Sequence, residues 1–183
     1  MGRFGPNQVV KEHLDRLRTG VKSWNAWRAQ SPEIVPGLGG QNVAGFDLSG
    51  ANLRGAFLFN AGLSNCNLRD CDLRGANMQA AKLEGALVQG SKLDSANLVV
   101  AELTSLDLHH ASLNNADFQG AKMEGVNLEG QILRGCDFRR ACLAGTNLRH
   151  TNLRKAQLSP LPTPWSVEEY NDACFIVRDL LPL

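Results

Sequence analysis

The histidines have the broadest chemical range in this chain of 183 residues, because imidazole serves as acid, base or metal ligand near neutral pH. They are His13, His109, His110 and His150, and none has a cysteine or carboxylate at metal-site spacing. The sequence also lacks a Walker loop, a GxSxG motif, an HExxH motif and a dinucleotide fingerprint. We therefore expect no catalytic residue, no metal and no cofactor, and an enzyme is the least favoured function.

The elements that would position any site follow a repeat of five residues. Residues 46–160 form 23 consecutive repeats, and the third residue of each is Leu, Met, Val or Phe. An α-helix returns to the same face every 3.6 residues and a strand every 2, so a period of five requires a chain that turns a corner in each repeat. This predicts an all-β solenoid.

The other positions of the repeat fit a narrow tube. The first position is Ala in 13 repeats, and a small inward side chain beside a large one fills the interior. The second is Asp or Asn in 12 repeats, where a short side chain can bond nearby backbone, and the fifth is Gly in ten, where a turn can require positive φ. Bulky fifth residues such as Val100, Arg140 and Lys155 predict a different turn at those places.

The pattern resembles the pentapeptide-repeat family, A(D/N)LXX, over about two thirds of the chain. The resemblance implies a right-handed quadrilateral β-helix with four repeats per coil. Residues twenty apart would then stack at roughly 4.8 Å, and 23 repeats would make nearly six coils. His110 and His150 would occupy one slot two coils apart, roughly 9.6 Å, which is too far for a catalytic pair.

Stacking by twenties sorts the outward residues onto four faces and concentrates positive charge on one. The face centred on Leu53 and its stacked equivalents has a net charge of +4, against −2, 0 and −1 for the others. It is a candidate surface for an anionic partner, either an acidic protein patch or phosphates, and an ordinary solvated face is the alternative. The absence of interleaved aromatic residues argues against direct nucleic-acid binding. The cations of this basic face are Arg54, Arg74, Lys92, Arg134, Arg154 and Lys155.

Two other faces carry distinctive side chains. Phe57 and Phe59, with Val99 and Val100 two coils beyond, form a candidate apolar contact patch wherever the amino-terminal helix leaves them uncovered. On another face Lys82, Glu102 and Lys122 lie in one slot and are expected to form a ladder of alternating charge.

Residues 1–45 are expected to cap the first coil. Val10, Leu14, Leu17, Val21, Trp24 and Trp27 form one stripe of an amphipathic helix over about residues 7–29, with Thr19-Gly20 as a candidate break. The segment Trp24-Asn25-Ala26-Trp27-Arg28 resembles the leader of some cyanobacterial pentapeptide-repeat proteins. A lid on the coil is favoured over a partner surface for the two tryptophans.

Residues 161–183 are expected to form a second cap. Pro160, Pro162 and Pro164 end the ladder, and Ser166 with Glu169 forms a capping box that opens a short helix. That helix is expected to close the last coil, to form a homodimer contact, or both.

The cysteines and the first residues of the chain indicate the cellular compartment. Cys66, Cys71 and Cys136 fall in inward slots and none of the five cysteines forms a CxxC, so we expect core thiols in a reducing compartment, with Cys142 as the modifiable one. No apolar run is long enough to span a membrane, and residues 1–6 lack the apolar core of a signal peptide. These features favour a cytoplasmic protein without a membrane partner.

The sequence predicts a class of function and does not name a partner. A rigid rod without a chemical site suits a non-catalytic scaffold that binds another protein through a face or a capping helix. Some members of the family resemble duplex DNA and bind gyrase, which is the alternative. DNA mimicry needs a dominant acidic surface, whereas the repeat region sums to +1, and the projecting loops of several such members are absent.

Overall fold

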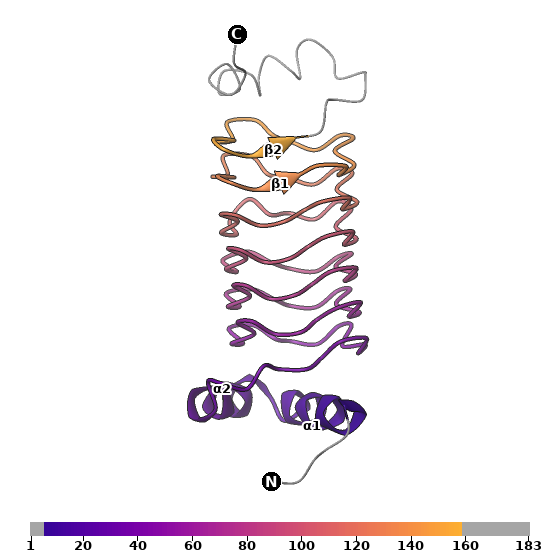
Figure 1. Cartoon of the computed structure of the whole chain (residues 1–183), viewed down its shortest axis with the longest axis vertical. Coiled ribbons are helices and arrows are strands. Elements are labelled where there is room, and N and C mark those ends of the chain that lie inside the picture. The colour runs from indigo at the N-terminus through magenta and orange to yellow at the C-terminus, as the bar shows by residue number, and fades with distance from the viewer. Residues whose placement is uncertain (1–5, 159–183) are drawn as a thin grey trace.

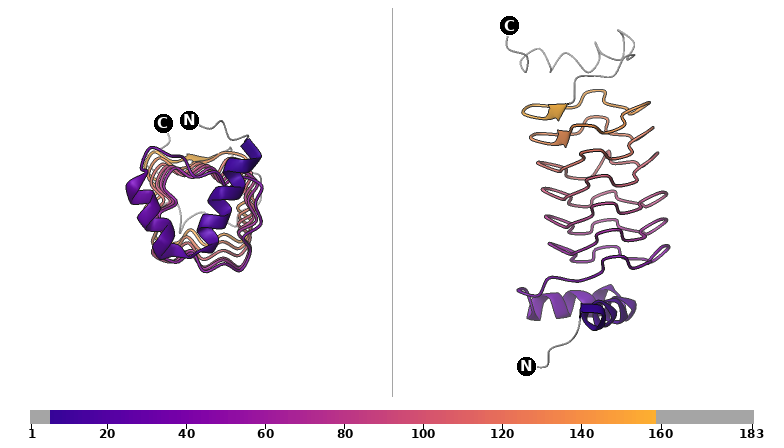
Figure 2. Two further views of the ribbon diagram at one scale, coloured as in Figure 1. Left: turned by 90° about the horizontal axis from the view of Figure 1, so that it is seen from below. Right: turned by 45° about the vertical axis from the view of Figure 1, so that its right-hand side comes forward.

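The computed structural model describes residues 6–158, which form a rod of stacked square coils with two helices at one end (Figure 1). The helices are α1 (Pro6–Arg18) and α2 (Val21–Gln30), and the last two coils contain short strands β1 (Asp137–Phe138) and β2 (Gln157–Leu158). Viewed from below, the coils superpose as a square, and the two helices lie across this end of it (Figure 2). The long axis of the rod is therefore the stacking direction of the coils.

Adjacent coils pair in parallel, and the paired residues are twenty apart. The bridges run from Gly37 with Phe57 to Gln157 with Asp137. The predicted stacking by twenties is thus confirmed, and Lys82 lies beside Glu102 as expected.

The bridged region begins two repeats earlier than the predicted boundary at residue 46. Gly37 and Asn42 already pair with the next coil, and Leu38 and Val43 are buried as third-position residues. The predicted boundary was therefore too late. These two repeats begin with Pro36 and Gln41 rather than alanine, so the first-position pattern did not reveal them.

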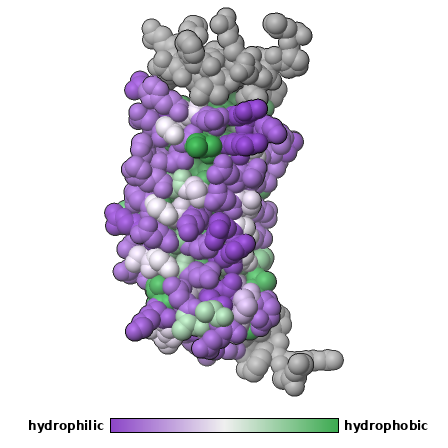
Figure 3. All heavy atoms as spheres, turned by 90° about the vertical axis from the view of Figure 1, so that its left-hand side faces the viewer, coloured by the Kyte–Doolittle hydropathy of each residue, from purple (hydrophilic) through white to green (hydrophobic). Residues whose placement is uncertain are grey.

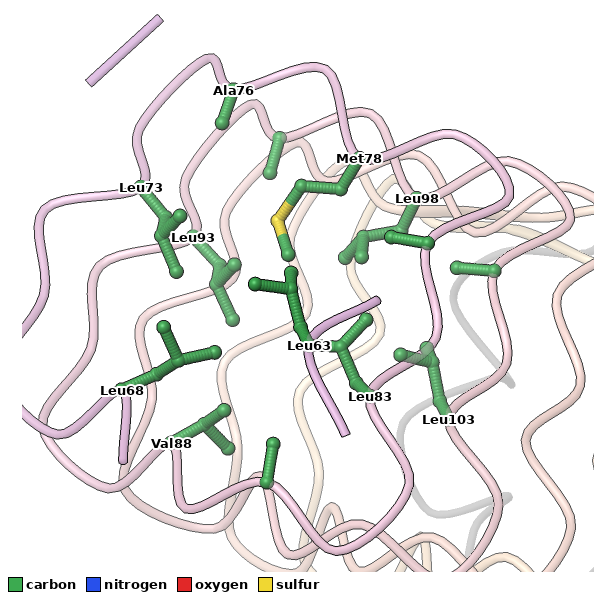
Figure 4. Packing of buried hydrophobic residues seen from close by; sticks show 14 of the residues in the cluster. Leu63, Leu68, Leu73, Ala76, Met78, Leu83, Val88, Leu93, Leu98 and Leu103 are labelled. Carbon is green, nitrogen blue, oxygen red and sulfur yellow. The ribbon is translucent and has the colours of Figure 1, made fainter. Parts of the chain in front are cut away.

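The third-position side chains fill the tube. They point inward from successive coils and interdigitate with the small first-position residues (Figure 4). Most are less than 3% exposed, and the rings of Phe118 and Phe138 stack with centroids 5.1 Å apart and planes 3° apart. Packing of this density explains why a large residue recurs at every third position.

Every described fifth-position residue except His110 has positive φ, whether or not it is glycine. Gly50 has φ 69°, and Val100, Arg140 and Lys155 have φ 51°, 62° and 63°. The change of turn predicted at Val100, Arg140 and Lys155 is therefore wrong. A left-handed residue costs roughly 1–2 kcal/mol, which is less than the loss of a turn that positions the bonds to both neighbouring coils.

The ladder is irregular at His109 and His110. Gly90 N–H bonds to the His110 carbonyl, whereas the equivalent Gly50 N–H bonds to Arg69, one residue earlier in its repeat. The side chain of Gln131, in the coil above, donates from Nε2 to the carbonyls of Leu108 and His109. A long amide in a slot that usually holds alanine thus accompanies the local change.

The second-position Asp and Asn residues behave as predicted. All twelve accept a hydrogen bond on Oδ1 from the backbone N–H two residues later, at 3.0–3.3 Å. These bonds fix each corner of the coil.

The two helices are separated at Thr19-Gly20, where Gly20 has φ 106°. Leu14, Leu17 and Trp24 are buried, while Val21 and Trp27 pack partly buried against the core. The predicted stripe is thus the face turned to the coil. The expected carboxyl-terminal helix over residues 161–183, with its capping box and dimer contact, lies outside the described residues.

Candidate interaction surfaces

A regular repeat bonds to the preceding coil through three backbone groups. In the repeat of Asp72, the Asp72 N–H donates to Ala51, and the carbonyls of Asp72 and Arg74 accept from Leu53 and Gly55, all at 2.9–3.0 Å. The repeat of Asn52 lies at the start of the rod, where α2 takes the place of a preceding coil (Figure 1).

Side chains of α2 supply all three missing partners there. Asn25 Oδ1 accepts from Asn52 N–H at 2.8 Å, and Trp24 Nε1 donates to the Asn52 carbonyl at 2.8 Å. Arg28 Nη2 donates to the Arg54 carbonyl at 3.2 Å. Trp24, Asn25 and Arg28 therefore reproduce the bonding of a coil, which keeps this edge of the ladder satisfied.

His13 of α1 meets the first bridged repeat in the same way. Its Nδ1 accepts from Gly37 N–H at 2.9 Å, and its ring lies 5.0 Å from that of Trp27. Burial lowers the pKa of His13, and the nearby Arg16 and Arg28 act in the same direction. The neutral imidazole that accepts this bond is thereby favoured.

The basic face contains cations of two kinds. Arg74 pairs with Asp72, its Nη2 lying 2.6 Å from Oδ2, and this pairing lowers the pKa of the Asp72 carboxyl. In the part of the chain that the structure describes, no carboxylate pairs with the other five predicted cations, all of them exposed. These are Arg54, Lys92, Arg134, Arg154 and Lys155.

The sequence indicates which arginines pair with a carboxylate and which do not. Asp at the second position with Arg at the fourth gives an ion pair in both places where it occurs, Asp72–Arg74 and Asp137–Arg139. Where the second residue is Asn, as in Asn152 before Arg154, its side chain bonds only the backbone of that arginine.

Asp94 interrupts the basic face near its middle. Its carboxylate accepts hydrogen bonds from the side chain of Ser112 and from the backbone and side chain of Asn114. Burial opposes ionisation, but these bonds together outweigh it and lower the pKa of Asp94. Asp94 therefore lies between Arg54 on one side and Arg134, Arg154 and Lys155 on the other, with Lys92 in its own repeat.

The apolar patch is in two pieces. Phe57 and Phe59 are 45% and 41% exposed, with ring centroids 6.1 Å apart, and Phe57 lies close over Gly39. Val100 is 48% exposed two coils away, and Val99 is half-buried. Sequence did not reveal Ile34 and Val35, which are exposed just before the first bridged repeat. The face shown in Figure 3 is mainly hydrophilic, with hydrophobic side chains scattered over it.

The repeat itself identifies the family. The family model for pentapeptide repeats matches in eight copies between residues 38 and 159. The chain belongs to the pentapeptide repeat family. No curated protein matches its sequence.

Solved pentapeptide repeat proteins resemble the chain at low identity. Rfr23 from the cyanobacterium Cyanothece 51142 is 24% identical, with 74% of this chain and 97% of that one covered and a TM-score of 0.38. HetL from the cyanobacterium Nostoc, a protein involved in regulation of heterocyst differentiation, is 24% identical, with coverage of 66% and 76% and a TM-score of 0.29. QnrB1, a plasmid-mediated fluoroquinolone resistance protein, is 20% identical, with coverage of 66% and 73% and a TM-score of 0.32. These likenesses concern the fold alone.

The thiols of this pentapeptide repeat protein divide by burial. Cys66, Cys71 and Cys136 are buried, and each donates from Sγ to a backbone carbonyl of the preceding coil. Burial raises the pKa of Cys71 and Cys136 to about 12. Cys142 is exposed, as predicted.

Within residues 6–158 no cluster of three or more histidine, cysteine or carboxylate side chains is placed to hold a metal ion. No helix in that range has the length and apolar character needed to cross a membrane.

Proposed function

We propose that this pentapeptide repeat protein is a non-catalytic scaffold that binds an acidic partner protein through its basic face. The observation that carries the proposal is the row of exposed cations without carboxylate partners among the described residues, Arg54, Lys92, Arg134, Arg154 and Lys155. Stacked like charges repel modestly, so folding gains nothing from this arrangement. A partner that supplies the missing carboxylates would relieve that repulsion and gain electrostatic steering.

The rod is suited to this role because its faces are fixed. Coil-to-coil bonds set the spacing of Arg134 and Arg154, whose repeats are joined by a bridge between Ile132 and Asn152. Binding groups on such a scaffold lose little conformational freedom beyond that of their own side chains. We further infer that α1 and α2 act as the amino-terminal cap, because Trp24, Asn25 and Arg28 satisfy the open edge.

The alternative of a gyrase-binding DNA mimic has less support. Residues 36–158 carry twelve basic and eleven acidic side chains, a net charge of +1, which is unlike a duplex. A supercoiling assay with purified gyrase, with and without the protein, separates the two roles, and unchanged supercoiling is expected.

Comparative capture from native cell extract tests the scaffold role. The triple variant R54Q/R134Q/R154Q loses three positive charges on the basic face. The matched variant R18Q/R69Q/K82Q loses three positive charges elsewhere. A true partner should be recovered by wild type and by the matched variant, and lost with the basic-face variant. Recovery of the same proteins by all three would refute binding through this face.

A further inference from the structure

Charge is unevenly distributed along the rod. Residues 36–130 carry ten acidic and six basic side chains, a net charge of −4. Residues 131–158 carry six basic side chains against Asp137 alone, a net charge of +5. The near-neutral total therefore conceals a basic end in the last coils, which sorting by face does not reveal.

The basic end surrounds the rod on three of its four faces. Bridges join residues twenty apart, so residues 131–150 make one complete coil and residues 151–158 begin the next. The six cations lie in four repeats of these coils, and all are exposed. We call them the basic belt: Arg134, Arg139, Arg140, Arg149, Arg154 and Lys155.

One arginine of the belt already binds a carboxylate. Arg139 donates from both Nε and Nη2 to the carboxylate of Asp137, which is the forked geometry that suits guanidinium to carboxylates. No carboxylate of the described residues pairs with Arg134, Arg149, Arg154 or Lys155. These cations are open to carboxylates from another molecule.

The belt also includes an apolar side chain. Ile132 is 57% exposed and occupies the second position of the repeat that contains Arg134. It is bridged to Asn152 in the next coil, which bonds the backbone N–H of Arg154 through Oδ1. Isoleucine cannot make the equivalent bond and leaves apolar surface in water, so its value to the fold at this corner is small.

The coil beneath separates this patch from the rest of the basic face. It presents Ser112 and Asn114, whose side chains are both bonded to the carboxylate of Asp94. The polar groups of that coil are therefore engaged within the molecule. The free surface above it consists of Ile132, Arg134, Asn152, Arg154 and Lys155.

We propose that these last coils are the main binding site for the acidic partner, and that they recognise a segment in which carboxylates flank a large aliphatic side chain. The carboxylates bind Arg134 and Arg154, and the aliphatic side chain packs on Ile132. Phosphates would match the cations but leave Ile132 exposed, so a protein segment fits the patch better. This inference rests on the proposed function and limits it to one end of the basic face.

Two synthetic peptides of equal charge test the recognition, each fluorescently labelled and titrated with the full chain by anisotropy. One repeats Glu-Glu-Leu and the other repeats Glu-Glu-Ser, four times each. The wild type should bind the leucine peptide several-fold more tightly than the serine peptide. Both affinities should fall steeply between about 0.01 M and 0.1 M salt, where the Debye length shrinks from about 30 Å to 10 Å.

Three variants assign the contacts. R134Q/R154Q should bind both peptides at least about tenfold more weakly, because two charge-assisted contacts are lost. R54Q/K92Q removes two charges from the same face below the patch and should bind as wild type does. Ile132→Asn introduces a residue common at second positions, and should abolish the preference for leucine while retaining the affinity for the serine peptide. Circular dichroism verifies that each variant is folded.

The possible failures are distinct. Equal weakening by R54Q/K92Q and R134Q/R154Q would overturn the restriction to the last coils but leave recognition by the basic face intact. A leucine preference that persists in Ile132→Asn, or no binding of either peptide, would overturn the proposed recognition. Inorganic polyphosphate that binds more tightly than the leucine peptide, with no effect of Ile132→Asn, would show a phosphate site instead. The capture experiment uses the native partner, so it can succeed where these peptides fail.

Discussion

Asn25 of α2 accepts a hydrogen bond from the backbone N–H of Asn52 at 2.8 Å, in the place where the Ala51 carbonyl accepts from Asp72 N–H one coil later. Its Nδ2 also donates to the Gly50 carbonyl at 2.9 Å. One amide side chain thus joins the helical pair to the first coil at two points. An amide suits this role because it is donor and acceptor at once.

Asn25→Ala should therefore destabilise the amino-terminal end. The change leaves a half-buried N–H and a carbonyl without partners, which costs about 1–3 kcal/mol. Thermal unfolding and hydrogen exchange of residues 50–54 measure the effect, and exchange there should accelerate. Ser23→Ala, on an exposed position of the same helix, is the control and should change neither quantity. Unaltered exchange in Asn25→Ala would show that α2 does not protect the edge.

His13 gives the same junction a dependence on pH. Its pKa is lowered in the folded protein by burial, so it is neutral when folded and binds protons more readily when unfolded. Its contribution to stability is complete above the unfolded pKa of about 6.5 and is lost as pH falls through the lower folded pKa. The Tm of wild type should decline below about pH 6.5 more steeply than that of His13→Asn. His150→Asn, at an exposed turn, should keep the wild-type profile, and identical profiles in all three proteins would contradict the assignment.

The left-handed turns predict opposite effects of two substitutions. Val100 has φ 51° and its side chain is exposed, so Val100→Gly should stabilise the protein by about 1 kcal/mol through relief of backbone strain. Gly55 has φ 66° with open space around the site of a Cβ, so Gly55→Ala should destabilise it by about 1 kcal/mol for the same reason. Urea unfolding gives both values. A loss of stability in Val100→Gly would indicate that the packing of its side chain on Gly120 outweighs the strain.

The thiols should differ in reactivity. Cys71 and Cys136 have a pKa of about 12 and are buried, so almost no thiolate is available at pH 8. Iodoacetamide should modify Cys142 in the native protein and reach Cys66, Cys71 and Cys136 only after unfolding. Mass spectrometry of the labelled peptides follows this order, and native labelling of Cys71 would contradict the close packing of the tube.

Sequence predicts the part of this structure that repeats. Leu53, Leu73 and the other third-position residues specify the tube because each corner imposes the same environment, and Asp or Asn before them specifies the corner. The turn at Val100 was not predicted, because coil geometry overrides the conformational preference of one residue. Asn25 was not recognised either, because its role depends on where α2 lies in the fold. No repeat in the sequence marks it.

The candidate surface was predicted in outline only. Stacking by twenties places Arg154 one coil above Arg134 as expected. The Asp72–Arg74 pair requires knowledge that positions two and four of a repeat share a corner. The uneven charge along the rod, with a net charge of −4 over residues 36–130 and +5 over residues 131–158, can be counted from the sequence. It was not predicted, because charges were summed over whole faces.

The most direct test of the account is the salt dependence of partner affinity, measured by titration calorimetry with the protein recovered in the capture experiment. The account predicts that wild type and R18Q/R69Q/K82Q bind with equal affinity and lose it steeply with rising salt. It also predicts that R54Q/R134Q/R154Q binds at least about tenfold more weakly, because three charge-assisted contacts are lost, with a shallower salt dependence. Equal affinity and equal salt dependence in all three proteins would contradict recognition through the basic face.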